Sequence, residues 1–207
     1  MKRFFVFIGA LIAAASAFAQ TPQEIISRME EEMTKHQQEG VFMIVDVKIP
    51  IVGNLSTKTY TLGDKARMEV NAGGIDVITW LDAKSQWIYN SSKNEVEISA
   101  FAPGKSSGTE GDLSMFDDIT DGYDVAIEQE THEEWHLKCT KSKSNPDKDA
   151  PKTLSLVVAK GTYMPVSLTT KVSGVGMTMR DLKFGVSEKK VTFNADDFPD
   201  VKIIDKR

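Results

Sequence analysis

The sequence predicts a mainly β protein with a helical lid (α+β), in which one helix precedes a long antiparallel meander. Three observations lead to this fold class. Short runs of β-branched and aromatic residues alternate with a period of two, turn residues separate them regularly, and an amphipathic helical pattern stands before them. Taken alone, these patterns fit a sandwich, a barrel or an open barrel.

The first 19 residues have the composition of a secretory signal peptide. Lys2 and Arg3 precede an apolar run that is too short for a permanent membrane span, and small residues end it at Ala19. We expect cleavage before Gln20, a periplasmic protein, and one domain over residues 20–207. Removing residues 1–19 takes the formal net charge from −5 to −7, which argues against nucleic acid or an anionic membrane as the main partner.

The only cysteine, Cys139, is far from the expected cleavage point. We therefore expect no lipid anchor of the bacterial lipoprotein type. A single cysteine also excludes an internal disulfide framework and a cysteine-rich zinc site. We expect Cys139 to be a small buried residue on a strand.

The expected helix begins at Thr21-Pro22-Gln23-Glu24, which places a capping hydroxyl, a proline at the first helical position and a glutamate three residues after the cap. Four apolar residues then recur at helical spacing, and Gly40 ends the element. These residues are Ile25, Ile26, Met29 and Met33.

The period changes to two from residue 41 onward. Strands are expected at 41–49, 55–62, 65–71, 75–82, 85–90, 94–101, 123–130, 133–141, 153–160, 163–173, 175–185 and 190–193. Residues 142–151 are polar and proline-bounded, so they form a long hairpin loop. Because 41–45 and 75–81 are apolar on both faces, something must cover the second face, and the opening helix and residues 113–119 are the available cover.

Several short motifs resemble the periplasmic lipoprotein-carrier family (LolA-type). They are the turn and strand 82–89, which contains Trp87-Ile88-Tyr89, the strand 96–98, the segment 163–166, and the tail 191–205. The resemblance spans essentially the whole chain after residue 19. It implies an open antiparallel half-barrel of about ten to twelve strands, lidded by helices, with an apolar cavity for acyl chains. It also implies an arginine that tethers the lid; Arg67 matches it, although Met68 stands where the family has proline.

Flexible and aromatic apolar side chains are the candidates for lining that cavity. Thioethers suit a surface that accepts ligands of variable shape, although methionine and tryptophan also fill ordinary cores. The candidate cavity residues are Met43, Met68, Trp80, Trp87, Met115, Phe116, Ile119, Met177 and Met179. Residues 104–112 are glycine- and serine-rich, so we expect a hinge there and a mobile cover formed by Leu113, Met115, Phe116 and Ile119.

Two motifs resemble catalytic signatures, and their context opposes both. His132-Glu133-Glu134-Trp135-His136 matches the zinc motif H-E-x-x-H, which requires a helix, whereas residues 135–140 alternate as a strand. Residues 104–108 match G-x-S-x-G, but no strand-turn-helix pattern surrounds them. We therefore expect no catalytic residue, no metal and no cofactor.

The expected function is that of a carrier or chaperone that shields acyl chains of lipoproteins or lipids on the way to the outer membrane. Burying each methylene contributes about 0.8 kcal/mol, so binding needs no catalytic group. Donor and acceptor membrane proteins would be its partners, and the protein would be a monomer. The alternative is a ligand-sensing or regulatory module of the same clan, which would hold a ligand and a protein partner without passing cargo on.

Overall fold

The computed structural model describes residues 20–36, 38–51, 53–101 and 119–207. The helices in these ranges are α2 (Pro22–Lys35), α3 (Glu188–Val191) and the 3-10 helix η3 (Ala195–Asp197). The strands are β1 (Val41–Ile49), β2 (Gly53–Leu62), β3 (Lys65–Ala72), β4 (Ile75–Leu81), β5 (Ser85–Asn90), β6 (Glu95–Ala100), β7 (Tyr123–Glu130), β8 (Glu134–Lys141), β9 (Thr153–Ala159), β10 (Pro165–Val172), β11 (Val175–Phe184) and β12 (Lys202–Asp205). The expected strands from 41–49 to 175–185 are confirmed as β1 to β11.

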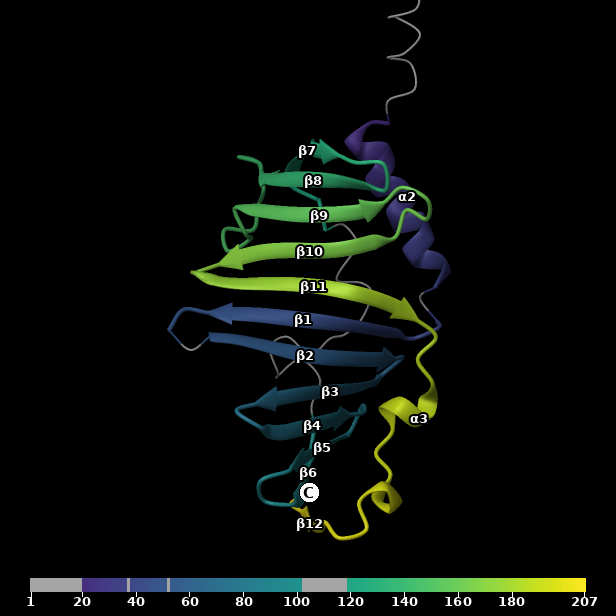
Figure 1. Cartoon of the computed structure of the whole chain (residues 1–207), viewed down its shortest axis with the longest axis vertical. Coiled ribbons are helices and arrows are strands. Elements are labelled where there is room, and N and C mark those ends of the chain that lie inside the picture. The colour runs from purple at the N-terminus through teal and green to yellow at the C-terminus, as the bar shows by residue number, and fades with distance from the viewer. Residues whose placement is uncertain (1–19, 37, 52, 102–118) are drawn as a thin grey trace, which may run out of the picture.

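All twelve strands form one sheet in the order β12-β6-β5-β4-β3-β2-β1-β11-β10-β9-β8-β7 (Figure 1). β12 and β7 are its edges, so the sheet is open rather than closed into a barrel, as the half-barrel prediction requires. The expectation of a wholly antiparallel sheet is wrong at one edge, because β12 pairs with β6 in parallel. Parallel strands cannot be joined by a tight hairpin, and here β7 to β11, α3 and η3 all lie between β6 and β12 in the chain.

Helix α2 begins where the sequence predicts. The Thr21 hydroxyl accepts a hydrogen bond from the Glu24 backbone N–H at 3.2 Å, and the Glu24 carboxylate accepts one from the Thr21 N–H at 2.9 Å. This capping box satisfies two backbone donors that would otherwise lack partners. The four apolar residues of the helical pattern are all buried: Ile25, Ile26, Met29 and Met33.

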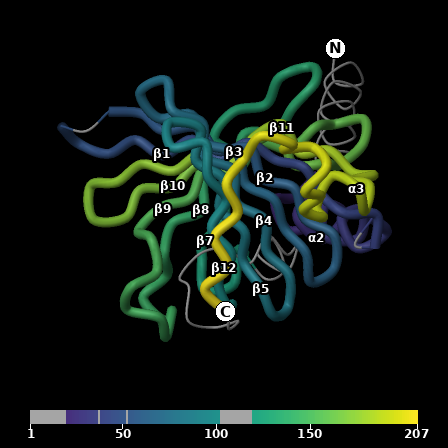
Figure 2. Tube along the Cα trace, turned by 90° about the horizontal axis from the view of Figure 1, so that it is seen from below, coloured from purple at the N-terminus to yellow at the C-terminus, as the bar shows by residue number. Residues whose placement is uncertain are grey.

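The expected strand at 190–193 is wrong, because Glu188–Val191 forms the short helix α3. Ser187 has the extended backbone of an N-cap residue. Glu188 lies in the first turn of α3 and two lysines lie in its last turn, so both signs of charge interact favourably with the helix dipole. After α3 the chain passes through η3 and crosses back to β12 (Figure 2). We call residues 188–201 the C-terminal segment.

The strand pairings define two faces of the sheet, because directly paired residues share a face and successive residues alternate. The helix face is the one that carries Val41, Met43 and Val45, and α2 packs on it. The tail face carries Phe42, Ile44 and Asp46 on the same strand. The C-terminal segment packs on the tail face, where Phe193 contacts the ring of Trp80, the partner of Arg67 on β3.

Several sequence predictions fall outside the described residues: the signal peptide, the hinge at 104–112 and the cover residues Leu113, Met115 and Phe116. The long loop between β8 and β9 is confirmed, since residues 142–152 contain neither helix nor strand. Among the helices that the structure describes, none is long and apolar enough to cross a membrane.

Candidate functional site

An apolar row runs across the helix face at one level of the sheet. Its members are directly paired from strand to strand, so their side chains stand side by side. From β7 to β5 they are Ile127, Leu137, Leu156, Leu168, Met179, Val45, Thr57, Val70, Val77 and Asn90. The residues of the row are apolar from β7 to β1. On β2 the row has a threonine, and on β3 and β4 it is apolar again, with Val70 and Val77.

Helix α2 covers only part of this row. Its buried residues form one core cluster with side chains from β1 and from β8 to β11, including Leu137 and Leu156, which are fully buried. Val70 and Val77 lie outside that cluster and are half-buried, and neither α2 nor the C-terminal segment packs on this face of β3 and β4. The helix face therefore has a filled half and a half in which Val70 and Val77 keep partial access to solvent, whereas Ala66 and Leu81 on the same two strands are buried.

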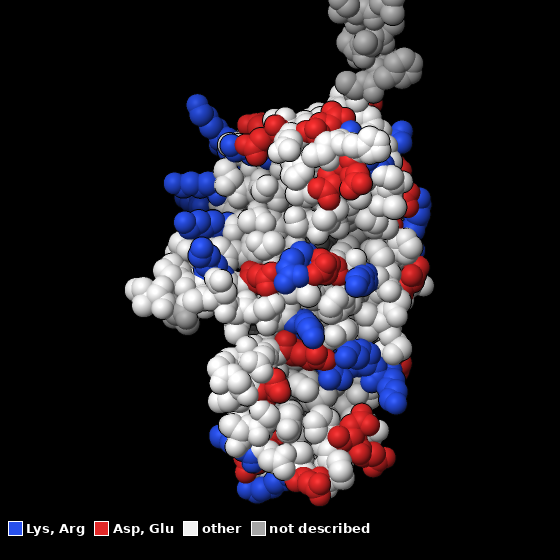
Figure 3. Space-filling view, in the orientation of Figure 1, with Lys and Arg blue, Asp and Glu red and all other residues white. Residues whose placement is uncertain are grey.

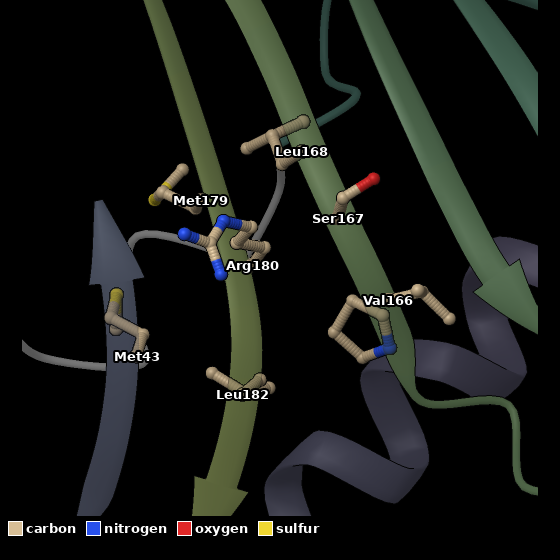
Figure 4. Close-up of a pocket in the computed structure, with 8 residues that line it drawn as sticks. Met43, Val166, Ser167, Leu168, Met179, Arg180 and Leu182 are labelled. Atoms are coloured by element: carbon tan, nitrogen blue, oxygen red, sulfur yellow. The ribbon is translucent and has the colours of Figure 1, made fainter. Parts of the chain in front are cut away.

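A small pocket lies within the filled half where strand pairing is irregular. The register shifts between Pro165 and Ser167 on β10 and between Phe42 and Ile44 on β1, and bulges of this kind leave space beside the ladder. The pocket has a volume of about 10 Å³ and is lined by Met43, Pro165, Val166, Ser167, Leu168, Met179, Arg180 and Leu182 (Figure 4). Small-molecule pockets usually occupy about 300–1,000 Å³, so this space, which has room for about one water molecule, is too small to hold an acyl chain in the conformation described.

Four of the predicted cavity residues belong to the helix face. Met43 and Met179 are buried and line the pocket. Met177 and Met68 are half-buried: Met177 pairs with Val47 on β1, and Met68 pairs with Thr59, the partner of Met43. The structure thus brings these four methionines onto one surface at the border of the filled half.

Trp80 and Trp87 lie on the opposite side of the sheet. They pair with each other on β4 and β5, and the C-terminal segment covers them with aromatic rings. The Phe193 ring centroid lies 5.3 Å from that of Trp80 and 6.0 Å from that of Trp87, and Phe198 lies 5.7 Å from Trp80. The two tryptophans therefore line a second core, which the sheet separates from the four methionines.

Arg67 also belongs to the tail face. Its guanidinium lies 5.0 Å from the centre of the Trp80 ring, and its Nε is 2.9 Å from Glu69 Oε1. Glu69 in turn accepts a hydrogen bond from Lys190 of α3 at 3.1 Å. The contacts of Arg67 therefore connect it to the C-terminal segment rather than to α2.

Ile119 packs against the α2 core cluster and lines a groove between Tyr123 and the loop at 145–151. Cys139, from the same cluster, is fully buried on β8 as expected. Burial disfavours the thiolate and raises the pKa of the Cys139 thiol to about 11. This thiol is a packing element of the filled half.

The residues of the H-E-x-x-H motif do not form the helix that zinc chemistry requires. His132 lies in the turn before β8, and His136 lies on β8 with its Nε2 3.4 Å from Glu134 Oε2. Within the described ranges no three histidine, cysteine or acidic side chains gather in a way that could hold a metal ion. The G-x-S-x-G match at 104–108 falls in the part that the structure does not describe.

Sequence reasoning missed Phe193 and Phe198 as cover for the tail face. Their spacing carries no helical or strand period, so periodicity did not reveal them. A usable signal was the pair of aromatic residues after the last long strand, since large rings rarely stay exposed without a partner.

No family model matches the chain, and no curated protein matches it. Several solved structures are similar to it. LprF from Mycobacterium bovis is 8% identical and aligns with a TM-score of 0.51 over 82% of this chain and 96% of that one. The lipoprotein LppX from Mycobacterium tuberculosis is 8% identical, with a TM-score of 0.47 over 81% and 98% of the two chains. A LolA superfamily protein from Nitrosomonas europaea is 11% identical, with a TM-score of 0.35 over 86% and 100%.

The chain shares the fold of LprF. The open sheet of twelve strands with α2 packed on one face agrees with the fold that the sequence motifs imply, and LprF shares the fold over most of its length. At 8% identity the likeness extends to the fold alone. An open half-barrel with a helix on one face is therefore the framework in which the helix face has to be interpreted.

Proposed function

We propose that this protein binds the acyl chains of lipids or lipoproteins in the cell envelope and carries them without catalysis. The observation that supports the proposal is the half-covered apolar row on the helix face, where Val70 and Val77 continue the row beyond the part that α2 fills. Soluble proteins rarely keep a continuous apolar surface accessible unless it contacts a ligand or a partner.

The acyl chain would lie along the helix face over Met177 and Met68 and extend towards Val70 and Val77. Flexible thioethers adapt to chains of different shape, and burial of methylenes supplies the free energy of binding. The surrounding threonines of β2 on this face, Thr57 and Thr59, present methyl groups as well as hydroxyls. No charged group of this row has to be neutralised before an apolar chain can lie on it.

The proposal is tested with adjacent residues on one strand. Val77→Thr replaces a methyl group on the helix face by a hydroxyl of nearly equal size, and Ile78→Thr makes a similar change on the tail face. Burying a hydroxyl without a partner costs about 1–3 kcal/mol, so Val77→Thr should weaken binding of a fluorescent fatty acid at least fivefold. Ile78→Thr should leave the affinity unchanged.

Equal effects of the two substitutions, or no binding of the fatty acid by the wild-type chain, would contradict the proposal. Mass spectrometry of the protein purified from its own envelope then separates two roles. Co-purified lipid or lipoprotein supports a carrier, whereas a stable protein partner supports a sensing module.

A further inference from the structure

The turn between β1 and β2 presents apolar residues to solvent. The Ile51 side chain has a relative exposure of 108%, and the neighbouring Pro50 is also exposed. Ile51 has a φ of 72°, a left-handed conformation that is strained for a β-branched residue and that glycine or asparagine would adopt more easily. Neither packing nor turn geometry within the chain therefore explains an isoleucine at this position.

The turn between β10 and β11 adds a second apolar residue beside the first. β1 and β10 both pair antiparallel with β11, so their following turns emerge at the same end of the sheet. Val172 is 42% exposed there, and a Cβ on Gly174 would lie 4.0 Å from Cγ of Pro50. We call Pro50, Ile51 and Val172 the apolar tip.

Lysines stand directly behind the apolar tip. Lys48 on β1 and Lys171 on β10 are both exposed, and both pair with Gly176 of β11 from opposite sides. Lys152, at the start of β9, is at the same end of the sheet. Within the described part of the chain none of these three lysines has an ion-pair partner. Figure 3 shows an uncharged protrusion on the left, with basic side chains gathered above it along the same margin.

From this arrangement we infer that the end of the sheet carrying the apolar tip docks on a lipid surface with anionic headgroups. The tip enters the boundary between headgroups and acyl chains, and the lysines contact the lipid phosphates. The protein as a whole is acidic, but charges are screened beyond about 8 Å, so the local excess of lysine determines the contact. A stable protein interface buries about 800 Å² on each partner, far more than two turns offer.

The docking surface is distinct from the acyl-binding row, so it does not depend on the proposed function. Lipid docking uses residues at the strand ends, whereas acyl binding uses Val70 and Val77 within the sheet. The two are measured separately, with vesicles in one case and with a soluble fatty acid in the other.

The test is co-sedimentation with vesicles of phosphatidylcholine, with and without phosphatidylglycerol. The chain from Gln20 is used, because it contains every described helix and strand. We expect binding to the anionic vesicles only, and weaker binding at high salt. Ile51→Asn should weaken it about tenfold, since it removes an apolar side chain, and should leave the fold at least as stable because asparagine tolerates the left-handed conformation. Lys48→Gln and Lys171→Gln should each weaken it about fivefold.

Matched substitutions away from the tip serve as controls. Ile203→Asn changes another exposed isoleucine, on the edge strand β12, and Lys84→Gln changes an exposed lysine in the turn between β4 and β5. Both should bind vesicles like the wild type. The inference is overturned if the wild-type chain binds neither vesicle, if Ile51→Asn binds as tightly as the wild type, or if the controls weaken binding equally.

Discussion

The two covers of the sheet differ in how they are held. Helix α2 fills its half with aliphatic, methionine and tryptophan side chains, and residues such as Ile25, Met29 and Leu156 have no exposed surface. The C-terminal segment covers the opposite face of β3 to β6 with one buried valine, Val191, with two half-buried phenylalanine rings and with ion pairs at the surface, among them the one between Lys65 and Glu188.

Because of this difference, the half under α2 should contribute more to the stability of the fold, and the region under the C-terminal segment should be easier to open. A close-packed core resists opening because each lost contact leaves a void, whereas surface ion pairs contribute little and half-buried rings retain part of their hydration. We therefore expect the α2 half to open only with global unfolding and the C-terminal segment to detach earlier.

Labelling of Cys139 gives the largest expected effect. At pH 8 a pKa of about 11 instead of 9.0 leaves about a hundredfold less thiolate, and complete burial slows the reaction further. Iodoacetamide should modify the folded protein more than a hundredfold more slowly than the protein in denaturant. Fast labelling of the folded chain would mean that the α2 half opens locally.

Leu156→Ala should destabilise the protein by about 3 kcal/mol, because it leaves a cavity beneath α2. Urea unfolding followed by circular dichroism measures the loss. Val166→Ala is the control on the neighbouring strand β10, since its side chain is partly exposed, and it should cost less than 1 kcal/mol. If the two variants lose similar stability, the α2 half is not the dominant core.

Phe193→Ala should cost about 1.5 kcal/mol, less than a fully buried ring, because the side chain is half-buried against Trp80 and Trp87. Limited proteolysis should then remove the C-terminal segment while Cys139 stays protected from labelling. Should Cys139 become accessible at the same time, the two covers would form one cooperative unit and the contrast between them would be lost.

Asp46→Asn should have the smallest effect, about 0.5 kcal/mol at neutral pH. The Arg180 guanidinium, whose Nε lies 2.6 Å from the Asp46 carboxylate, holds the pKa of Asp46 below 3.8. Its contribution is therefore complete above pH 3.8 and is lost as the pH falls through the lowered value. Unfolding of both chains across this range should converge in acid, whereas Asp124→Asn, at an exposed position on β7, should show no such convergence.

Much of the fold could be predicted because its signals are local. Thr21 and Glu24 form the expected capping box, and the alternation of Val41, Phe42 and Met43 gives both the strand and its two faces. Residues 190–193 contain valine, threonine and phenylalanine and so resemble a strand, yet a short helix forms there because Val191 is buried against the sheet. That contact joins residues far apart in the chain, which local propensity does not detect.

The candidate site was predicted only in part for a related reason. Alternation shows that neighbours within one strand point to opposite faces, but it does not show which face of β4 matches which face of β3. The turn at 73–74 sets that register and pairs Trp80 with Arg67 and Thr79 with Met68. Without the register, the sequence does not assign the methionines to the helix face and the tryptophans to the tail face, so all of them are predicted to line one cavity.

The pairing of β1 with β11 has a consequence for how the chain folds. β1 to β6 and β7 to β11 are two consecutive meanders whose strands pair with their neighbours in sequence, and β1–β11 is the single seam between them. The first meander is synthesised long before β11. The edge of β1 that pairs with β11 therefore stays unpaired until the second meander has been made. Closing a loop of that length is slow, and an unpaired edge recruits other strands. The centre of the finished sheet thus assembles after both of its flanking meanders, and until then it is exposed to mispairing.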